Sequence, residues 1–115
     1  MRVLKFRAFF DGKMHQVSSY SIGGLVQLVG DGTPRLGLPV VQYTGLKDRN
    51  GVEIFEGDIV KNGDSNYIIR YIDNFGRYVA TKNDESISWP LGEGETIEII
   101  GNIYEHPHLL NEGAK

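Results

Sequence analysis

Residues 42–60 read QYTGLKDRNGVEIFEGDIV, a stretch in which charged side chains, three glycines and bulky apolar residues follow one another closely. Its Asn50-Gly51 pair is the strongest short-range turn signal, because both residue types accept positive φ at low cost. Apolar residues flank this pair on both sides, and Glu56-Gly57-Asp58 predicts a second turn. The stretch therefore predicts short strands joined by tight turns, and with them a mainly β fold.

The charges in this stretch have two interpretations. Lys47 and Arg49 would bind a phosphate group if the segment were a ligand-binding loop. Alternatively, the glycines set the backbone geometry and the charges stay solvated, while Asp58 bonds the backbone N–H groups of its own turn. Turn chemistry explains each Gly and Asn without a ligand, so we expect the second interpretation to hold.

Towards the C-terminus the pattern continues as β-branched and aromatic runs between turn signals. Strands are expected at 66–72, 77–81, 86–91 and 96–104. Gly101 predicts a bulge within the last strand, and HPHLLN predicts one helical turn in a C-terminal tail of residues 105–115. Short strands at this spacing favour an SH3-like small barrel over residues 40–104.

Towards the N-terminus, RVLKFRAFF alternates apolar and charged residues as a strand with one buried face does. Asp11-Gly12 predicts a hairpin turn, so residues 1–17 are expected to form an N-terminal β-hairpin. Residues 18–39 carry many Gly, Ser and Pro residues around LVQLV, which could be a strand, and we interpret the region as a long, variable, irregular loop. The whole chain, 1–115, is expected to be a single domain.

Composition narrows the function classes. The chain has no cysteine, which excludes disulfides, thiolate metal sites and cysteine nucleophiles and suits a reducing cytoplasm. Its first residues are charged and lack a long apolar run, so neither a signal peptide nor a membrane span is expected. The net charge of −3 gives no general reason to expect nucleic acid.

No catalytic, cofactor-binding or metal-ligating residue is assigned from the sequence. The carboxylates Glu53, Glu56 and Asp58 lie close together, but nothing predicts the two different environments that acid–base catalysis needs. His106 and His108 flank Pro107 and fall short of the three or four ligands of a zinc site. Phosphate-loop and dinucleotide fingerprints are absent from the sequence. We therefore expect a protein that is not an enzyme and needs no cofactor.

Nucleic-acid binding is an open alternative. Small barrels bind single strands through aromatic side chains on an open face beside basic residues. The residues that could form such a platform are Tyr67, Tyr71, Phe75, Tyr78 and Trp89, with Arg70 and Arg77. The competing expectation is that most of these aromatic side chains are core residues or cross-strand pairs. The candidate surface for nucleic acid or for a protein partner comprises Arg70, Tyr71, Arg77, Tyr78, Lys47 and Arg49.

Three blocks give the chain a family resemblance. The central block, the N-terminal KFRAF and the C-terminal IEIIGNIYEHPHLL resemble the YopX protein family in order and spacing. Phe9 stands where that family usually has Trp, which keeps an aromatic ring and loses an N–H donor. The resemblance implies a small protein encoded by a phage or prophage of Gram-positive bacteria. It implies no established activity and no catalytic residues.

By elimination we expect an accessory protein that acts through protein–protein contacts with a phage or host protein, or as a homo-oligomer. The core predicted for it comprises Leu4, Phe6, Tyr43, Leu46, Ile54, Phe55, Ile59, Val60, Ile69, Tyr71, Val79, Trp89, Ile97, Ile99 and Ile103.

Overall fold

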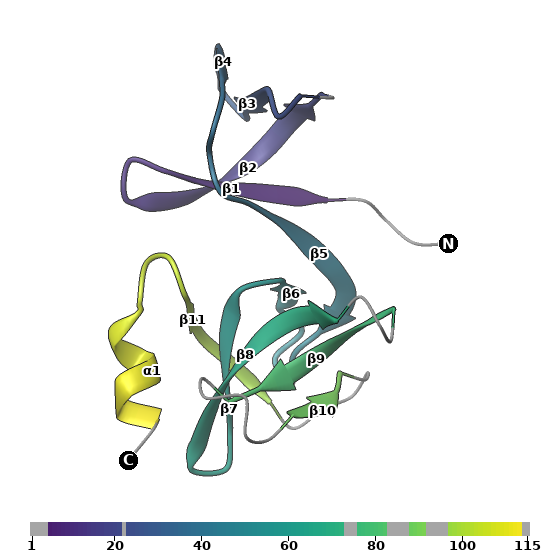
Figure 1. The fold of residues 1–115 in the computed structure, drawn as a ribbon, viewed down its shortest axis with the longest axis vertical. Helices are drawn as coiled ribbons and strands as arrows, with labels where there is room; N and C mark the ends of the chain where they lie inside the picture. Colours follow the sequence, from purple (N-terminus) through teal and green to yellow (C-terminus); the bar gives the residue numbers. More distant parts are fainter. Residues whose placement is uncertain (1–4, 22, 73–75, 83–87, 92–96, 114–115) are drawn as a thin grey trace. The chain divides into compact units, whose positions relative to one another are not determined.

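The structure, a computed structural model, describes residues 5–21, 23–72, 76–82, 88–91 and 97–113 and consists mainly of antiparallel β-strands (Figure 1). The predicted β class is confirmed. The chain divides into two compact units, Met1–Tyr43 and Thr44–Lys115, each of which is described by itself. The strand β5 (Val40–Lys47) passes from the first unit into the second.

The first unit is a meander that begins with the predicted hairpin. Its strands are β1 (Phe6–Phe10), β2 (Lys13–Tyr20), β3 (Val26–Leu28) and β4 (Asp31–Arg35). They lie in the order β4-β3-β2-β1, followed by β5. Asp11 and Gly12 have φ of 54° and 78°, the conformation that a two-residue hairpin turn requires. Ala8, Val26 and Leu28 form the buried centre of this unit.

The loop predicted over residues 18–39 is wrong in part. The end of β2 and the whole of β3 and β4 lie there, and β3 falls within the LVQLV run. The Gly and Pro residues of this segment predict a loop, because these residue types are the strongest local turn and loop signals. Pro34 is nevertheless accommodated because β4 is the last strand of its sheet, where an N–H facing outward is not needed.

The second unit contains the remaining elements. They are β6 (Glu53–Phe55), β7 (Asp58–Asn62), β8 (Ser65–Ile72), β9 (Arg77–Thr81), β10 (Ser88–Pro90), β11 (Glu98–Asn102) and the helix α1 (His108–Gly113). Five strands make one antiparallel sheet in the order β10-β9-β8-β7-β11. No closed barrel is found within the described ranges, so the SH3-like barrel is not confirmed and stays a prediction.

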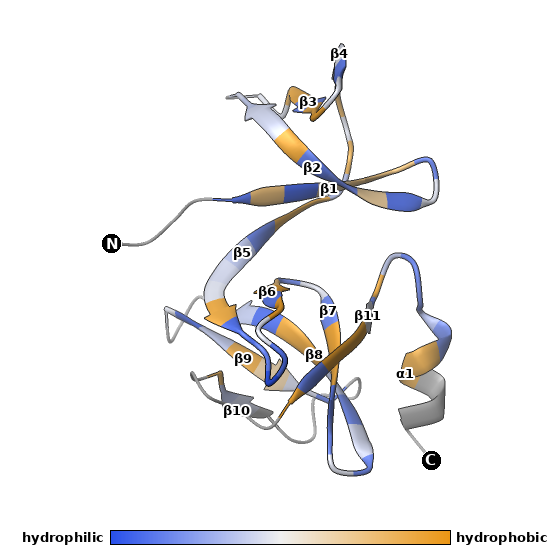
Figure 2. Cartoon of the chain, turned by 180° about the vertical axis from the view of Figure 1, so that it is seen from behind, coloured by the Kyte–Doolittle hydropathy of each residue, from blue (hydrophilic) through white to orange (hydrophobic). Residues whose placement is uncertain are grey.

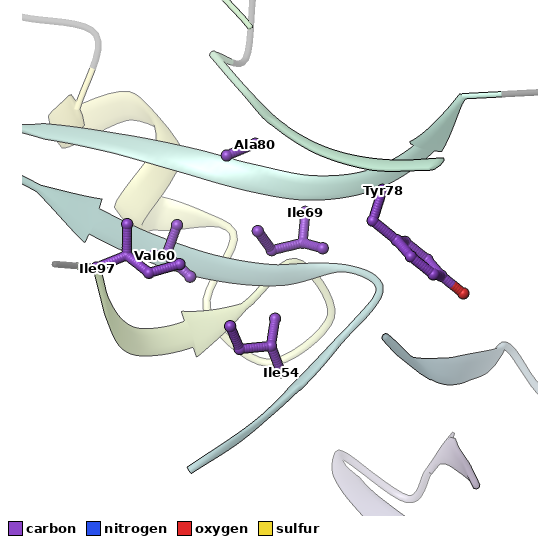
Figure 3. Close-up of a cluster of buried hydrophobic side chains, with 6 residues drawn as sticks. All are labelled: Ile54, Val60, Ile69, Tyr78, Ala80 and Ile97. Atoms are coloured by element: carbon purple, nitrogen blue, oxygen red, sulfur yellow. The ribbon is translucent and has the colours of Figure 1, made fainter. Parts of the chain in front are cut away.

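Apolar residues of this sheet and of the segments beside it form the main core. Ile54, Val60, Ile69, Tyr78, Ala80 and Ile97 are buried together, and Figure 3 shows them between the strands. Ile68, the neighbour of Ile69 on β8, is also buried, so both faces of this strand are covered. Figure 2 shows hydrophobic residues along β7, β8 and β11, which are neighbours in this sheet.

Most of the predicted core is confirmed. Tyr43, Ile54, Phe55, Ile59, Val60, Ile69, Val79 and Ile97 are buried, and Phe6, Leu46, Trp89, Ile99 and Ile103 are half-buried. Tyr71 is the error, since 40% of it is exposed. It pairs across the strands with the buried Tyr78 and stands at the rim of that cluster. Leu4 lies outside the described residues.

The helix α1 packs against β8, where the side-chain amide of Asn66 donates a hydrogen bond of 3.0 Å to the carbonyl of Leu109. Asn66 and Ile68 lie on one face of β8 because side chains alternate along a strand. The single helical turn predicted at the C-terminus is therefore confirmed, and the helix covers part of the face that carries Ile68.

The bulge predicted at Gly101 is also present. The register between β11 and β7 shifts between Ile99 and Gly101. A Cβ atom at position 101 would lie 2.6 Å from Nδ1 of His106. The His106 ring is held there, because its Nδ1 accepts a hydrogen bond from the N–H of Asn102 at 3.2 Å.

We predict that Gly101→Ala lowers the free energy of unfolding by about 1–3 kcal/mol, because the methyl group overlaps the held imidazole ring. Gly32→Ala is the matched control, since nothing lies within 4 Å of its Cβ position and its φ is not positive. Urea denaturation of both variants, with His106→Ala added to Gly101→Ala, measures the effect. Equal stability of the two glycine variants, or no relief from His106→Ala, would refute the overlap.

Candidate functional site

The quoted segment folds around the carboxylate of Asp48, which follows β5 and is buried. Its Oδ1 accepts hydrogen bonds from the backbone N–H groups of Asn50 at 2.8 Å and of Val52 at 2.9 Å. Its Oδ2 accepts a third, from the N–H of Ile99 at 3.0 Å. One side chain therefore closes the turn and fastens it to a strand about fifty residues away.

These bonds also cover the outer edge of β11. The N–H of Arg49 donates to the carbonyl of Ile97 at 3.0 Å, next to the bond between Asp48 and Ile99. Since Ile99 lies opposite Val60 of β7, the turn binds β11 from the side that β7 leaves open. The turn thus replaces a neighbouring strand and prevents uncontrolled edge pairing.

The pKa of Asp48 is set by two opposing effects. Burial raises this pKa. The hydrogen bonds from the N–H groups of Ile99, Val52 and Asn50 together lower it by more than burial raises it, so the pKa of Asp48 lies below its ordinary value. The pKa of Asp31 in the first unit is lowered too, by the N–H of Thr33 and then by the guanidinium of Arg35. A lowered pKa keeps a carboxylate ionised, which is the opposite of what a general acid requires.

Two other polar side chains of the segment bond the backbone in the same manner. Asp58 is buried, and its Oδ2 accepts from the N–H of Phe55 at 2.8 Å, as expected from the sequence. The hydroxyl of Thr44 donates to the carbonyl of Ile54 at 2.8 Å and accepts from the N–H of Leu46. The buried polar groups of the segment are thus bound to backbone, while Lys47 and Arg49 are exposed.

The histidines near the C-terminus belong to a second turn of this kind. The side chain of Asn102 accepts from the N–H groups of Tyr104 and Glu105 and donates to the carboxylate of Glu105. His106 accepts from Asn102, and its ring lies 6.2 Å from that of His108. Among the described residues, no group of three His, Cys, Asp or Glu side chains is arranged to hold a metal ion.

The predicted binding surface is divided by the sheet. Arg70 lies opposite Val79, and Tyr71 lies opposite Tyr78, so the arginine and the tyrosines point to opposite faces of β8 and β9. Arg77 pairs with Ile72 and shares the face of Arg70. The structure therefore brings Arg70 and Arg77 to one face and Tyr71 and Tyr78 to the other.

The aromatic side chains pack against one another and against the core. Tyr67 and Trp89 make an edge-to-face contact with ring centroids 5.7 Å apart, and Tyr71 and Tyr78 make another at 5.1 Å. Tyr67 and Trp89 lie half-buried against the main core, and Tyr78 is part of it. Phe75 lies outside the described residues. The four described aromatic residues thus contact one another in two pairs, and Tyr71 alone among them is exposed. An open stacking platform would need several exposed rings.

Sequence reasoning missed a group of exposed apolar side chains in the first unit. Leu25, Val29 and Leu36 are 42%, 60% and 66% exposed, and they flank β3 and β4. The alternation of LVQLV contains the signal for two of them, but their exposure depends on which face of β3 is buried. That choice requires the register with β2 and β4.

Comparison with known proteins supports the family resemblance of the central and terminal blocks. The family model described as YopX protein matches residues 7–111. The chain belongs to the YopX family. No curated protein matches it.

A solved structure is similar to this YopX chain over nearly its whole length. The crystal structure of protein EF1440 from Enterococcus faecalis is similar, with a TM-score of 0.58 and 28% sequence identity. The similarity covers 96% of this chain and 99% of that one. Within the described part of this YopX chain, no helix is long and apolar enough to cross a membrane.

We predict that Asp48→Asn destabilises the protein by about 1–3 kcal/mol at pH 7, because the amide cannot accept all three N–H bonds and leaves one donor unsatisfied. The folded pKa of Asp48 is lowered, so its stabilisation is complete above the unfolded pKa near 3.8 and is lost as pH falls through the folded value. The difference between wild type and variant therefore shrinks below about pH 4.

Urea denaturation from pH 7 to pH 2 measures this difference. Asp64→Asn, a change in an exposed turn residue, is the control and shifts stability by less than about 0.5 kcal/mol. A difference that stays constant down to pH 2 would contradict the role assigned to the Asp48 carboxylate.

Proposed function

We propose that this YopX protein is a non-enzymatic accessory protein that acts through contacts with a phage or host protein, or with its own copies. The observation that carries the proposal is the exposure of Leu25, Val29 and Leu36 in the first unit. Single exposed apolar residues are ordinary, but several around one pair of short strands are typical of an interaction site.

The chemistry of the central segment supports the same proposal. Asp48, Asp58 and Thr44 bind backbone groups, so their polar atoms serve the fold. Family membership supports an origin in a phage or prophage, and a chain without cysteine suits the host cytoplasm. Single-stranded nucleic-acid binding has less support, because Arg70 and the Tyr71–Tyr78 pair point to opposite faces of the sheet.

Affinity capture from phage-infected host lysate tests the proposal. We expect wild type to retain a specific protein and Leu25→Ser/Leu36→Ser to lose it, because the double change removes apolar area at the contact. Val52→Ser is the matched control, since Val52 is 48% exposed in the second unit and should retain the protein. The protein-contact function would be refuted if neither wild type nor Val52→Ser captured a lysate protein and wild type also did not associate with itself.

Fluorescence anisotropy with labelled oligonucleotides tests the alternative function, the binding of single-stranded nucleic acid. We expect no binding at about 50 μM protein. Micromolar binding that weakens steeply between about 50 and 200 mM salt would indicate phosphate contacts and favour the nucleic-acid function instead.

A further inference from the structure

Two arginines of the second unit are neighbours on one face of its five-stranded sheet. Arg70 of β8 lies opposite Val79, and Arg77 of β9 lies opposite Ile72. The two arginines are therefore diagonal cross-strand neighbours, whose Cα atoms lie about 7–8 Å apart in such pairs, and their long side chains can reach a common point. We call Arg70 and Arg77 the arginine pair.

The arginine pair is not neutralised by the protein. Among the described residues, neither guanidinium group makes an ion pair, a hydrogen bond or a ring contact. Arg35 provides the contrast, since its guanidinium binds the Asp31 carboxylate at 2.9 Å. Carboxylates are plentiful in the second unit, because residues 44–115 contain thirteen Asp and Glu but only seven Lys and Arg side chains. The two arginines are thus left unpaired in an acidic unit.

The surroundings of Arg70 make this arrangement unfavourable without a ligand. Arg70 is half-buried, and its Nε is shielded from solvent and has no hydrogen-bond acceptor, whereas its two terminal nitrogens stay accessible. A shielded N–H without an acceptor is rare in native proteins and often marks the place of a bound water or ion. Like charges on neighbouring strands also repel each other. A bound anion would relieve this repulsion.

The charge and geometry of the pair select the kind of anion. A carboxylate carries one negative charge on two oxygens, and a single guanidinium already satisfies it in a bidentate pair. A phosphate group with one ester bond carries a charge near −2 and three acceptor oxygens, so it matches two guanidinium groups. A nucleic-acid backbone phosphate carries only one charge. The rings of Tyr71 and Tyr78, which could stack on bases, point to the opposite face of the sheet.

We propose that Arg70 and Arg77 together bind a phosphate dianion, either inorganic phosphate or the terminal phosphate of a small molecule. Arg77 is exposed and Arg70 is half-buried, so the anion enters from the side of Arg77. The terminal nitrogens of Arg70 and the guanidinium of Arg77 donate to different phosphate oxygens. The site goes beyond the proposed protein-contact function, which rests on residues of the first unit.

An NMR titration with sodium phosphate at pH 7.5, with sodium chloride keeping the ionic strength constant, tests the inference. We expect the backbone amide resonances of Arg70 and Arg77 to shift together and to saturate with a dissociation constant of about 1 mM or below. Arg77→Gln should weaken binding at least ~10-fold, because one of the two charged forks is lost. Arg77 is exposed, so this variant should fold like wild type by circular dichroism.

Arg49→Gln is the matched control, since Arg49 is an exposed arginine of the same unit and its backbone N–H, not its side chain, bonds Ile97. This variant should bind phosphate like wild type. Acetate, a carboxylate, should bind wild type at least ~10-fold more weakly than phosphate does. Adenosine monophosphate distinguishes the two sources of the dianion. Tighter binding than phosphate would assign the site to a phosphate ester, and weaker binding would assign it to free phosphate.

The inference would be overturned if phosphate caused no saturable shift up to about 20 mM, or if acetate bound as tightly as phosphate. Equal weakening by Arg49→Gln and Arg77→Gln would overturn it too, because it would show attraction to overall charge. So would an oligonucleotide without a terminal phosphate that binds through the arginine pair more tightly than phosphate, which would favour the nucleic-acid function. The capture of a lysate protein is measured separately and does not depend on the phosphate result.

Discussion

Three backbone N–H groups converge on the carboxylate of Asp48, and much of the second unit depends on that convergence. Two of the donors belong to the turn after β5 and the third to β11, far along the chain. A neutral side chain of similar size cannot accept all three bonds, and burial makes an unpaired donor expensive. The charge is therefore retained for the fold, and its lowered pKa is a consequence of the same contacts.

The turn of Asn102 and His106 performs a related task at the other end of β11. Asn102 bonds the N–H groups that follow it, and the His106 ring occupies the space that Gly101 leaves by having no Cβ. Near the start of β11, Asp48 thus binds a backbone N–H that a further strand would otherwise satisfy, and at its end Asn102 closes the turn that follows the strand. Asp48, Asp58 and Asn102, which lie in the central and C-terminal blocks, thus bind backbone groups and serve the fold.

Much of the fold could be predicted from turn-forming residues. The remaining features depend on strand register, which the sequence alone does not specify. Asp11-Gly12, Asn50-Gly51 and the bulge at Gly101 follow from local backbone preferences that the sequence states directly. The strand β4 was missed because Pro34 is read as a loop signal unless its edge position is known. The burial of Tyr71 could not be predicted because it depends on where β9 begins, whereas Ile69, two residues earlier, lies opposite the middle of β9.

The candidate surfaces show the same limit. Alternation alone separates Arg70 from Tyr71, but only the pairing with β9 shows that Tyr71 joins Tyr78 rather than Arg77. The exposure of Leu25, Val29 and Leu36 required still more, because it depends on which residues of β3 are buried. The pairing of the charged Arg35 with the buried Val26 is likewise visible only once the register of β3 with β4 is known.

The most direct test of the Asp48 account is an NMR pH titration of the backbone amide resonances of Asn50, Val52 and Ile99. Because all three N–H groups donate to one carboxylate, the account predicts that they shift together with a single midpoint below the ordinary Asp value of 3.8. An Ile99 amide that does not respond, or that titrates separately from the other two, would contradict it.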